Sequence, residues 1–232
     1  MIERYLRPPV VLVYHGVGSA RDDDARLLIT LERLESQIRF LQRLGYRFRT
    51  AEELIEEGRP RSQTAVLTFD DGFRSWLTEV APLLQRLGVP ATFYVCPGLF
   101  GKQHERLSGE PGRFLDQGEA RALAETGMEL GSHSLSHPDL RLLGSGELVV
   151  ELRDSKAAVE RITGRPCRTL AYPYGFYDER VTQAAAEAGY ELAFAWLPGP
   201  WHPLSAPRLP APPRGGALRL AIKLLGVRRP GR

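Results

Sequence analysis

Short apolar runs alternate with longer amphipathic stretches along most of the chain. The short runs are rich in β-branched and aromatic side chains and are bounded by polar or turn-forming residues, a pattern that favours buried strands. We expect seven strands, at residues 10–14, 46–48, 65–69, 91–95, 128–131, 168–172 and 191–196.

The stretches between these runs have the spacing of helices. Apolar residues recur every three or four positions, and a glycine stands where each helix would end. Two further helices begin at capping-box sequences, Thr50 with Glu53 and Asp116 with Glu119. We expect helices at residues 31–44, 75–87, 147–163 and 178–188, and helices opening after Thr50 and Asp116.

Strands that alternate with helices imply parallel pairing through right-handed crossovers. Seven such units in a chain of 232 residues predict a small (β/α) barrel, complete or incomplete, with a doubly wound open sheet as the alternative. We expect one catalytic domain over residues 1–213 and a basic helix or tail over residues 214–232. In either architecture the functional site lies beyond the carboxyl ends of the strands.

Polar residues follow four of the expected strands directly. His15 follows the first strand and Asp70-Asp71 follows residues 65–69. His133 and His137 follow residues 128–131, and Pro173-Tyr174-Gly175 follows residues 168–172. These groups are therefore expected to meet at one end of the barrel.

Two adjacent carboxylates at the end of an apolar strand repel each other unless a cation lies between them or one is protonated. Neighbouring side chains on an extended chain point to opposite sides, so one of Asp70 and Asp71 could bind a metal while the other faces a water molecule. The alternative is a simple turn, which Asp-Asp-Gly also favours.

The chain has only five histidines, and His133 and His137 are four residues apart, with Pro138 directly after. Two imidazoles and one carboxylate form an open catalytic zinc site that leaves room for water. Such a site also accepts cobalt, manganese or nickel. The alternative is a pair of surface histidines on a loop.

Three segments together resemble the leading motifs of the polysaccharide deacetylase family, the NodB homology group of carbohydrate esterase family 4. They are Thr68-Phe69-Asp70-Asp71-Gly72, His133-Ser134-Leu135-Ser136-His137 and Tyr172-Pro173-Tyr174-Gly175. The resemblance implies a distorted (β/α)7 barrel and metal-dependent removal of acetyl groups from N-acetylated sugars of a poly- or oligosaccharide.

The resemblance also implies roles for individual residues. Asp71, His133 and His137 would bind the divalent metal, most simply Zn²⁺, and Asp70 would be the general base. The backbone N–H of Tyr174 would help to hold the oxyanion, and Tyr172 and Pro173 would line the substrate groove. These roles agree with general chemistry, because a metal-activated water needs a base and a tetrahedral oxyanion needs a donor.

The sequence departs from the family pattern at two points. The Leu-x-His motif that supplies the general acid in most members is absent, and we expect His15 to be the acid, with His202 as the alternative. Ala171 stands where many members have an arginine that braces the base. We place Arg208 among the substrate-binding residues and as a candidate to brace Asp70, and we expect Trp201 to stack on a sugar.

Composition narrows the class of protein. Charged residues make up 25%, the net charge is +3, and no apolar run reaches the roughly 18 residues of a membrane span. We expect a cytoplasmic protein with no nucleic-acid partner, and envelope association as the alternative. The carbohydrate substrate could be lipid-linked or part of the cell envelope, and the basic tail could touch a membrane surface. Cys96 and Cys167 are expected to be buried thiols.

Two other functions fit the same residues. One is a metal-dependent hydrolase of another C–N bond, such as a deformylase or a cyclic amidase. The other is a carbohydrate-binding homologue that has lost catalysis, which the missing Leu-x-His motif and Ala171 would favour. The presence of both Asp70 and Asp71 argues against pure binding, because binding needs no general base beside a metal.

Overall fold

The computed structural model describes residues 9–19, 27–58, 63–196 and 200–227. Its centre is a barrel of parallel strands, which closes because β1 hydrogen-bonds to both β5 and β10. The remaining neighbours follow in the order β5, β6, β7, β8, β9 and β10. The seven barrel strands are β1 (Val10–Tyr14), β5 (Thr64–Asp71), β6 (Thr92–Val95), β7 (Glu129–Ser132), β8 (Thr169–Ala171), β9 (Leu192–Trp196) and β10 (Ala206–Pro210).

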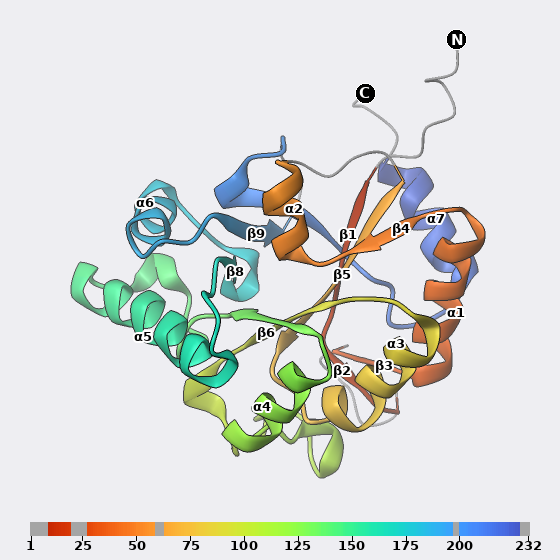
Figure 1. The fold of residues 1–232 in the computed structure, drawn as a ribbon, viewed down its shortest axis with the longest axis horizontal. Helices are drawn as coiled ribbons and strands as arrows, with labels where there is room; N and C mark the ends of the chain where they lie inside the picture. The colour runs from red at the N-terminus through yellow and green to blue at the C-terminus, as the bar shows by residue number, and fades with distance from the viewer. Residues whose placement is uncertain (1–8, 20–26, 59–62, 197–199, 228–232) are drawn as a thin grey trace.

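Helices lie around the outside of the strands (Figure 1). A π-helical turn at Trp76–Val80 leads directly into α3. The α-helices are α1 (Leu31–Arg43), α2 (Ala51–Glu57), α3 (Ala81–Leu87), α4 (Gln117–Glu125), α5 (Ser145–Thr163), α6 (Glu179–Glu187) and α7 (Ala217–Val227). The expected (β/α)7 barrel is therefore confirmed, and it is closed rather than incomplete.

Two details of the predicted strand set were wrong. The strand expected at residues 46–48 is β4 (Arg47–Arg49), which pairs with β5 but lies outside the closed ring. The strand that completes the ring is β10, which was not among the seven expected strands and which contains Pro207 and Pro210. Prolines remove ladder donors and usually mark edges of sheets. A second small sheet pairs β2 (Gly16–Val17) with β3 (Leu28–Ile29).

Side chains of β5 alternate between the barrel interior and the helical layer. Phe69 stacks on Tyr14 and Phe93 in the outer layer, with ring centroids 5.2 and 4.8 Å away. Thr68 and Asp70, one position either side of Phe69, therefore point to the interior. Apolar packing on the outer face thus fixes the register that directs Asp70 inward.

Helix α2 closes the amino-terminal end of the barrel. The N–H of Ala51 donates to Oγ1 of Thr92 at 2.8 Å, and the N–H of Glu52 donates to Oε2 of the half-buried Glu129 at 2.9 Å. Thr92 and Glu129 are the first residues of β6 and β7. With this end covered, access to the interior is from the carboxyl ends of the strands.

Helix α7, in the segment expected to be a basic helix or tail, packs against α1 and buries Leu220 completely. Residues 228–232 of that segment lie outside the described residues. Among the described helices, none has the length and apolarity needed to cross a membrane. Cys96 and Cys167 are both buried free thiols, as expected.

Candidate active site

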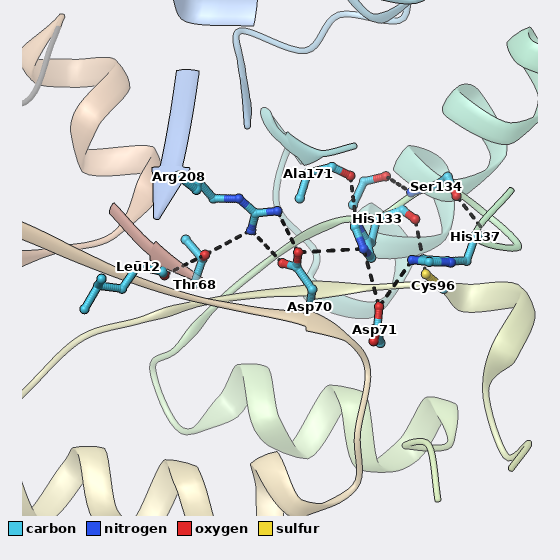
Figure 2. Close-up of polar contacts among 11 residues, drawn as sticks. Leu12, Thr68, Asp70, Asp71, Cys96, His133, Ser134, His137, Ala171 and Arg208 are labelled. Atoms are coloured by element: carbon cyan, nitrogen blue, oxygen red, sulfur yellow. Dashed lines mark hydrogen bonds and ion pairs between the residues drawn. The ribbon is translucent and has the colours of Figure 1, made fainter. Parts of the chain in front are cut away.

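Asp70 is held inside the barrel by an arginine from β10, which only β1 separates from β5 in the ring. Nη1 and Nη2 of Arg208, on β10, donate to Oδ1 and Oδ2 of Asp70 at 2.7 and 2.6 Å. Arg208 is fully buried, and its Nη1 also donates to Oγ1 of Thr68 at 3.0 Å. Figure 2 shows the guanidinium facing the carboxylate edge on. This bidentate contact fixes both the position and the orientation of the carboxylate.

Asp71, the next residue, turns toward the two histidines. Its Oδ1 lies 3.5 Å from Nε2 of His133 and 3.3 Å from Nε2 of His137 (Figure 2). One ligand atom from each of the three residues fits within a cluster whose members are at most 4.8 Å apart. The expected trio of metal ligands is therefore brought together.

The orientation of His133 suits metal binding. Its Nδ1 lies 2.6 Å from the carbonyl oxygen of Ala171, which can only accept, so Nδ1 carries the proton. In the neutral imidazole Nε2 then keeps its lone pair, and this lone pair faces Asp71. Three acceptor atoms that converge in this way need a shared cation or proton. Together they fit the donor set of a divalent metal of the zinc type.

The loop that carries the histidines is anchored by two polar residues of α5. Glu151 accepts hydrogen bonds from the N–H groups of Leu135 and Ser136 at 2.8 and 2.9 Å. The hydroxyl of Ser155 donates to the carbonyl oxygen of Ser134 at 2.9 Å. Nothing in the sequence pattern singled out these two helix residues.

Backbone strain concentrates at the same place. Outside glycine, five described residues have positive φ, and four of them belong to the site. A positive φ is costly for such residues and persists where the surroundings hold it, often at functional sites. For Asp71 the value of 89° breaks the alternation of β5, which is why two adjacent carboxylates reach one pocket. The five are Gln63, Asp71, Ser134, His137 and Tyr174.

A cavity of about 600 Å3 opens above the carboxylates. His15 lines it together with Asp70, Asp71, His133 and His137. So does His104, a residue that the sequence did not single out. Four of the five histidines therefore surround one cavity, and its wall also includes Tyr174, Trp196, Lys102 and Arg106.

His202, the alternative acid, lies elsewhere. It is exposed and outside the cavity lining, and its Nδ1 accepts from the N–H of Leu204 at 3.2 Å. This contact caps the 3₁₀ turn at Pro203–Ser205. The geometry favours His15 over His202 as a group that can reach a substrate.

Four residues expected to contact substrate do not line the cavity. Tyr172 is fully buried, with its hydroxyl donating to the carbonyl oxygen of Leu204 at 2.9 Å. Trp201 packs against the apolar cluster inside the barrel and does not line the cavity. Arg208 is fully buried against Asp70, so it serves as the brace and not as a substrate contact. Pro173 is also buried and lies behind the cavity wall.

The electrostatics match the geometry. Burial alone would raise the pKa of Asp70, but Arg208 and then His133 outweigh it, so the pKa is lowered and the group is ionised at neutral pH. Burial opposes the ionisation of Asp71 as well, yet the hydrogen bond to His133 and the neighbouring histidines lower its pKa. Burial and the nearby His133 lower the pKa of His137 to about 4, so His137 is neutral. A neutral imidazole is the form that binds metals.

Comparison with known proteins relates this site to other chains. YxkH of Bacillus subtilis (strain 168) is 25% identical over 193 residues, which cover 82% of this chain and 64% of that protein. The chitooligosaccharide deacetylase of Sinorhizobium fredii (strain NBRC 101917 / NGR234) is 30% identical over 136 residues, covering 56% and 57%. The chain thus spans less than two thirds of the length of these curated relatives.

The fold has close counterparts among solved structures. The Streptococcus pyogenes deacetylase PplD, solved in complex with acetate, superposes with a TM-score of 0.77 at 24% identity, covering 94% of this chain and 98% of that one. Residues 57–193, which hold all three motifs, match the sequence pattern of the family named polysaccharide deacetylase. The chain therefore belongs to the polysaccharide deacetylase family.

Proposed function

We propose that the protein is a metal-dependent hydrolase that removes acetyl groups from N-acetylated sugars of a poly- or oligosaccharide. The observation that carries this proposal is the convergence of Asp71, His133 and His137 beside an ionised, braced Asp70 in one open cavity. A binding protein has no use for a braced carboxylate beside a metal site. The family membership and the name of the Sinorhizobium fredii relative support a glycan substrate.

Asp71, His133 and His137 would hold the metal, and Zn²⁺ suits this ligand set best, with Co²⁺, Mn²⁺ or Ni²⁺ as alternatives. A bound divalent metal acidifies a water molecule and polarises the acetyl carbonyl. The N–H at Nδ1 of His133 stays hydrogen-bonded to the carbonyl oxygen of Ala171, so the ring keeps one orientation throughout.

In the proposed reaction Asp70 accepts a proton from the attacking water, whose oxygen adds to the acetyl carbon. The backbone N–H of Tyr174 donates to the developing oxyanion, a role for which the strained turn at φ 58° would preorganise it. His15 then donates a proton to the sugar nitrogen as the C–N bond breaks, which gives acetate and a free amine. These three roles are proposals for this chain.

The test is acetate release from N-acetylglucosamine oligomers after stripping with a chelator and reloading with zinc or cobalt. The proposal expects release that needs the metal and is lost in Asp70→Asn and in Asp71→Ala. Because Asp70→Asn disturbs a buried ion pair, circular dichroism should first show that the variant is folded. His202→Ala is the matched control, since it removes an exposed histidine outside the cavity.

Other outcomes would redirect the proposal. A protein that binds zinc but releases no acetate from any oligomer contradicts sugar deacetylation, and formyl and cyclic amides would then be screened. A protein that binds oligosaccharide but no metal would be a binding homologue. Hydrolysis that survives in Asp70→Asn would exclude Asp70 as the base.

A further inference from the structure

A row of exposed flat groups leads out of the cavity from the metal-site histidines. The ring of Tyr174 lies 4.6 Å from that of His137, and the ring of Phe176 lies 6.0 Å from that of Tyr174. The guanidinium carbon of Arg141 lies 4.2 Å over the centre of the Phe176 ring. We call Tyr174, Phe176 and Arg141 the outer shelf. Tyr174 also lines the cavity, so the outer shelf is continuous with it.

The outer shelf is exposed yet fixed in place. Tyr174 and Phe176 are 49% and 44% exposed, so burial does not explain why apolar rings stand there. Arg141 donates from Nε and Nη2 to the two carboxylate oxygens of Asp139 at 3.0 and 2.7 Å. Arg180 in turn donates to the carbonyl oxygen of Arg141 at 2.9 Å. A preorganised exposed surface loses little conformational entropy when it binds a ligand.

We propose that the outer shelf binds a second sugar of the same glycan whose acetylated sugar enters the cavity. The apolar C–H face of a pyranose ring would stack on Phe176, and N–H groups of Arg141 not taken by Asp139 would donate to its hydroxyl groups. This inference rests on the proposed function and adds the place where a second sugar of the glycan binds and the residues that bind it. Chain length should therefore improve binding.

A membrane surface is the other partner that exposed apolar side chains can meet, and Leu142 beside the outer shelf is 82% exposed. Two observations favour the glycan. The rings continue directly into the catalytic cavity, and the guanidinium is held over a ring by its pairing with Asp139. A protein surface that inserts into a membrane needs neither feature.

The test measures binding without turnover. Calorimetric titration of the metal-free, chelator-treated protein compares the dimer and the pentamer of N-acetylglucosamine. The variants are Phe176→Ala, Phe176→Trp and, as a matched control, Val150→Ala, which trims an exposed apolar side chain on α5 away from the cavity. Acetate release by the zinc-loaded protein on the same two oligomers is measured in parallel, as is sedimentation with vesicles of anionic phospholipid.

The expected result is that wild type binds the pentamer more tightly than the dimer. Phe176→Ala should raise the Kd for the pentamer by about three- to tenfold, which corresponds to the free energy of one stacked ring. The difference in affinity between the pentamer and the dimer should therefore become smaller. Phe176→Trp should restore the higher affinity for the pentamer, and Val150→Ala should leave that affinity unchanged.

Equal Kd values for both oligomers, or a pentamer Kd that Phe176→Ala does not move, would overturn the outer shelf as a sugar site. Vesicle binding that depends on Phe176 while glycan binding does not would assign the outer shelf to a membrane. If wild type releases no acetate but pentamer binding still depends on Phe176, the proposed reaction fails and the sugar site stands.

Discussion

Arg208 and Asp70 form a buried, bidentate ion pair inside the barrel, with N···O distances of 2.7 and 2.6 Å. The arginine comes from the last strand of the ring and the carboxylate from β5, 138 residues earlier. The contact therefore ties the last strand of the ring to the ionisation of the candidate base.

Removing the arginine alone should damage both stability and activity. Arg208→Met leaves a carboxylate buried without its partner, and we expect a loss of about 3–5 kcal/mol in the free energy of unfolding. Arg208→Lys keeps a charge but not the planar pair of donors, so its loss should be smaller. Urea unfolding at neutral pH measures both. The double variant Arg208→Met, Asp70→Asn should be more stable than Arg208→Met, because it leaves no unpaired charge; if it is not, the pair does not act through charge.

The same contact sets a pH dependence. The pKa of Asp70 is lowered in the folded protein, so its ionised form stabilises the fold above the unfolded pKa of about 3.9, and this stability is lost as pH falls through the folded pKa. Without the two guanidinium donors, burial is opposed less strongly and the pKa of Asp70 rises. In the folded Arg208→Lys variant we expect the acidic limb of the kcat/KM profile to move to higher pH. An unmoved limb would mean that another group controls it.

The sequence revealed most of the site because its residues stand in short segments at the ends of clearly patterned strands. Asp70, Asp71, His133 and His137 needed only local spacing and the rule that parallel strands present their carboxyl ends together. The brace was harder to place. Arg208 lies between Pro207 and Pro210, and prolines argued against the strand that the barrel requires.

Other features had no local signal. Glu151 and Ser155 look like ordinary polar positions on the long helix α5, and only the folded arrangement brings them under the histidine loop. We expected Trp201 to stack on a sugar because the C–H faces of sugar rings suit aromatic surfaces. Its ring instead packs against the apolar interior of the barrel. Burial of this kind depends on long-range packing that a single sequence does not reveal.

Metal binding should depend on the three converging residues. Titration with zinc is expected to give one site per chain, and at 100 times the Kd zinc should add about 2.7 kcal/mol to stability. Asp71→Ala and His137→Ala should each weaken binding by more than about 100-fold, because changes to groups that only orient a ligand already cost about 10–100-fold. His202→Ala should bind zinc like wild type. Equal affinity in all variants would place the metal elsewhere.

The general acid can be distinguished by a pair of histidine variants. His15→Ala should lower kcat/KM for the N-acetylated oligomer by about 10²–10⁴-fold, the usual contribution of a positioned proton donor. His202→Ala should leave kcat/KM unchanged, since that side chain caps a 3₁₀ turn outside the cavity. If His15→Ala keeps the wild-type kcat/KM, His104 on the cavity wall becomes the next candidate.

The turn that carries Tyr174 can be probed through its neighbour Gly175. Gly175 has φ 67°, and an added Cβ would lie 2.5 Å from Cγ of Trp196. Gly164, at the end of α5, has the same φ with nothing within 4 Å, so it is a matched control. Gly164→Ala should cost about 1–2 kcal/mol of unfolding free energy for its backbone conformation alone. Gly175→Ala should cost more, and it should also lower kcat/KM, because the backbone N–H of Tyr174 moves with the turn. Calorimetric unfolding and initial rates measure the two effects. Equal losses of stability, together with unchanged kcat/KM in both variants, would show that the contact with Trp196 does not position Tyr174.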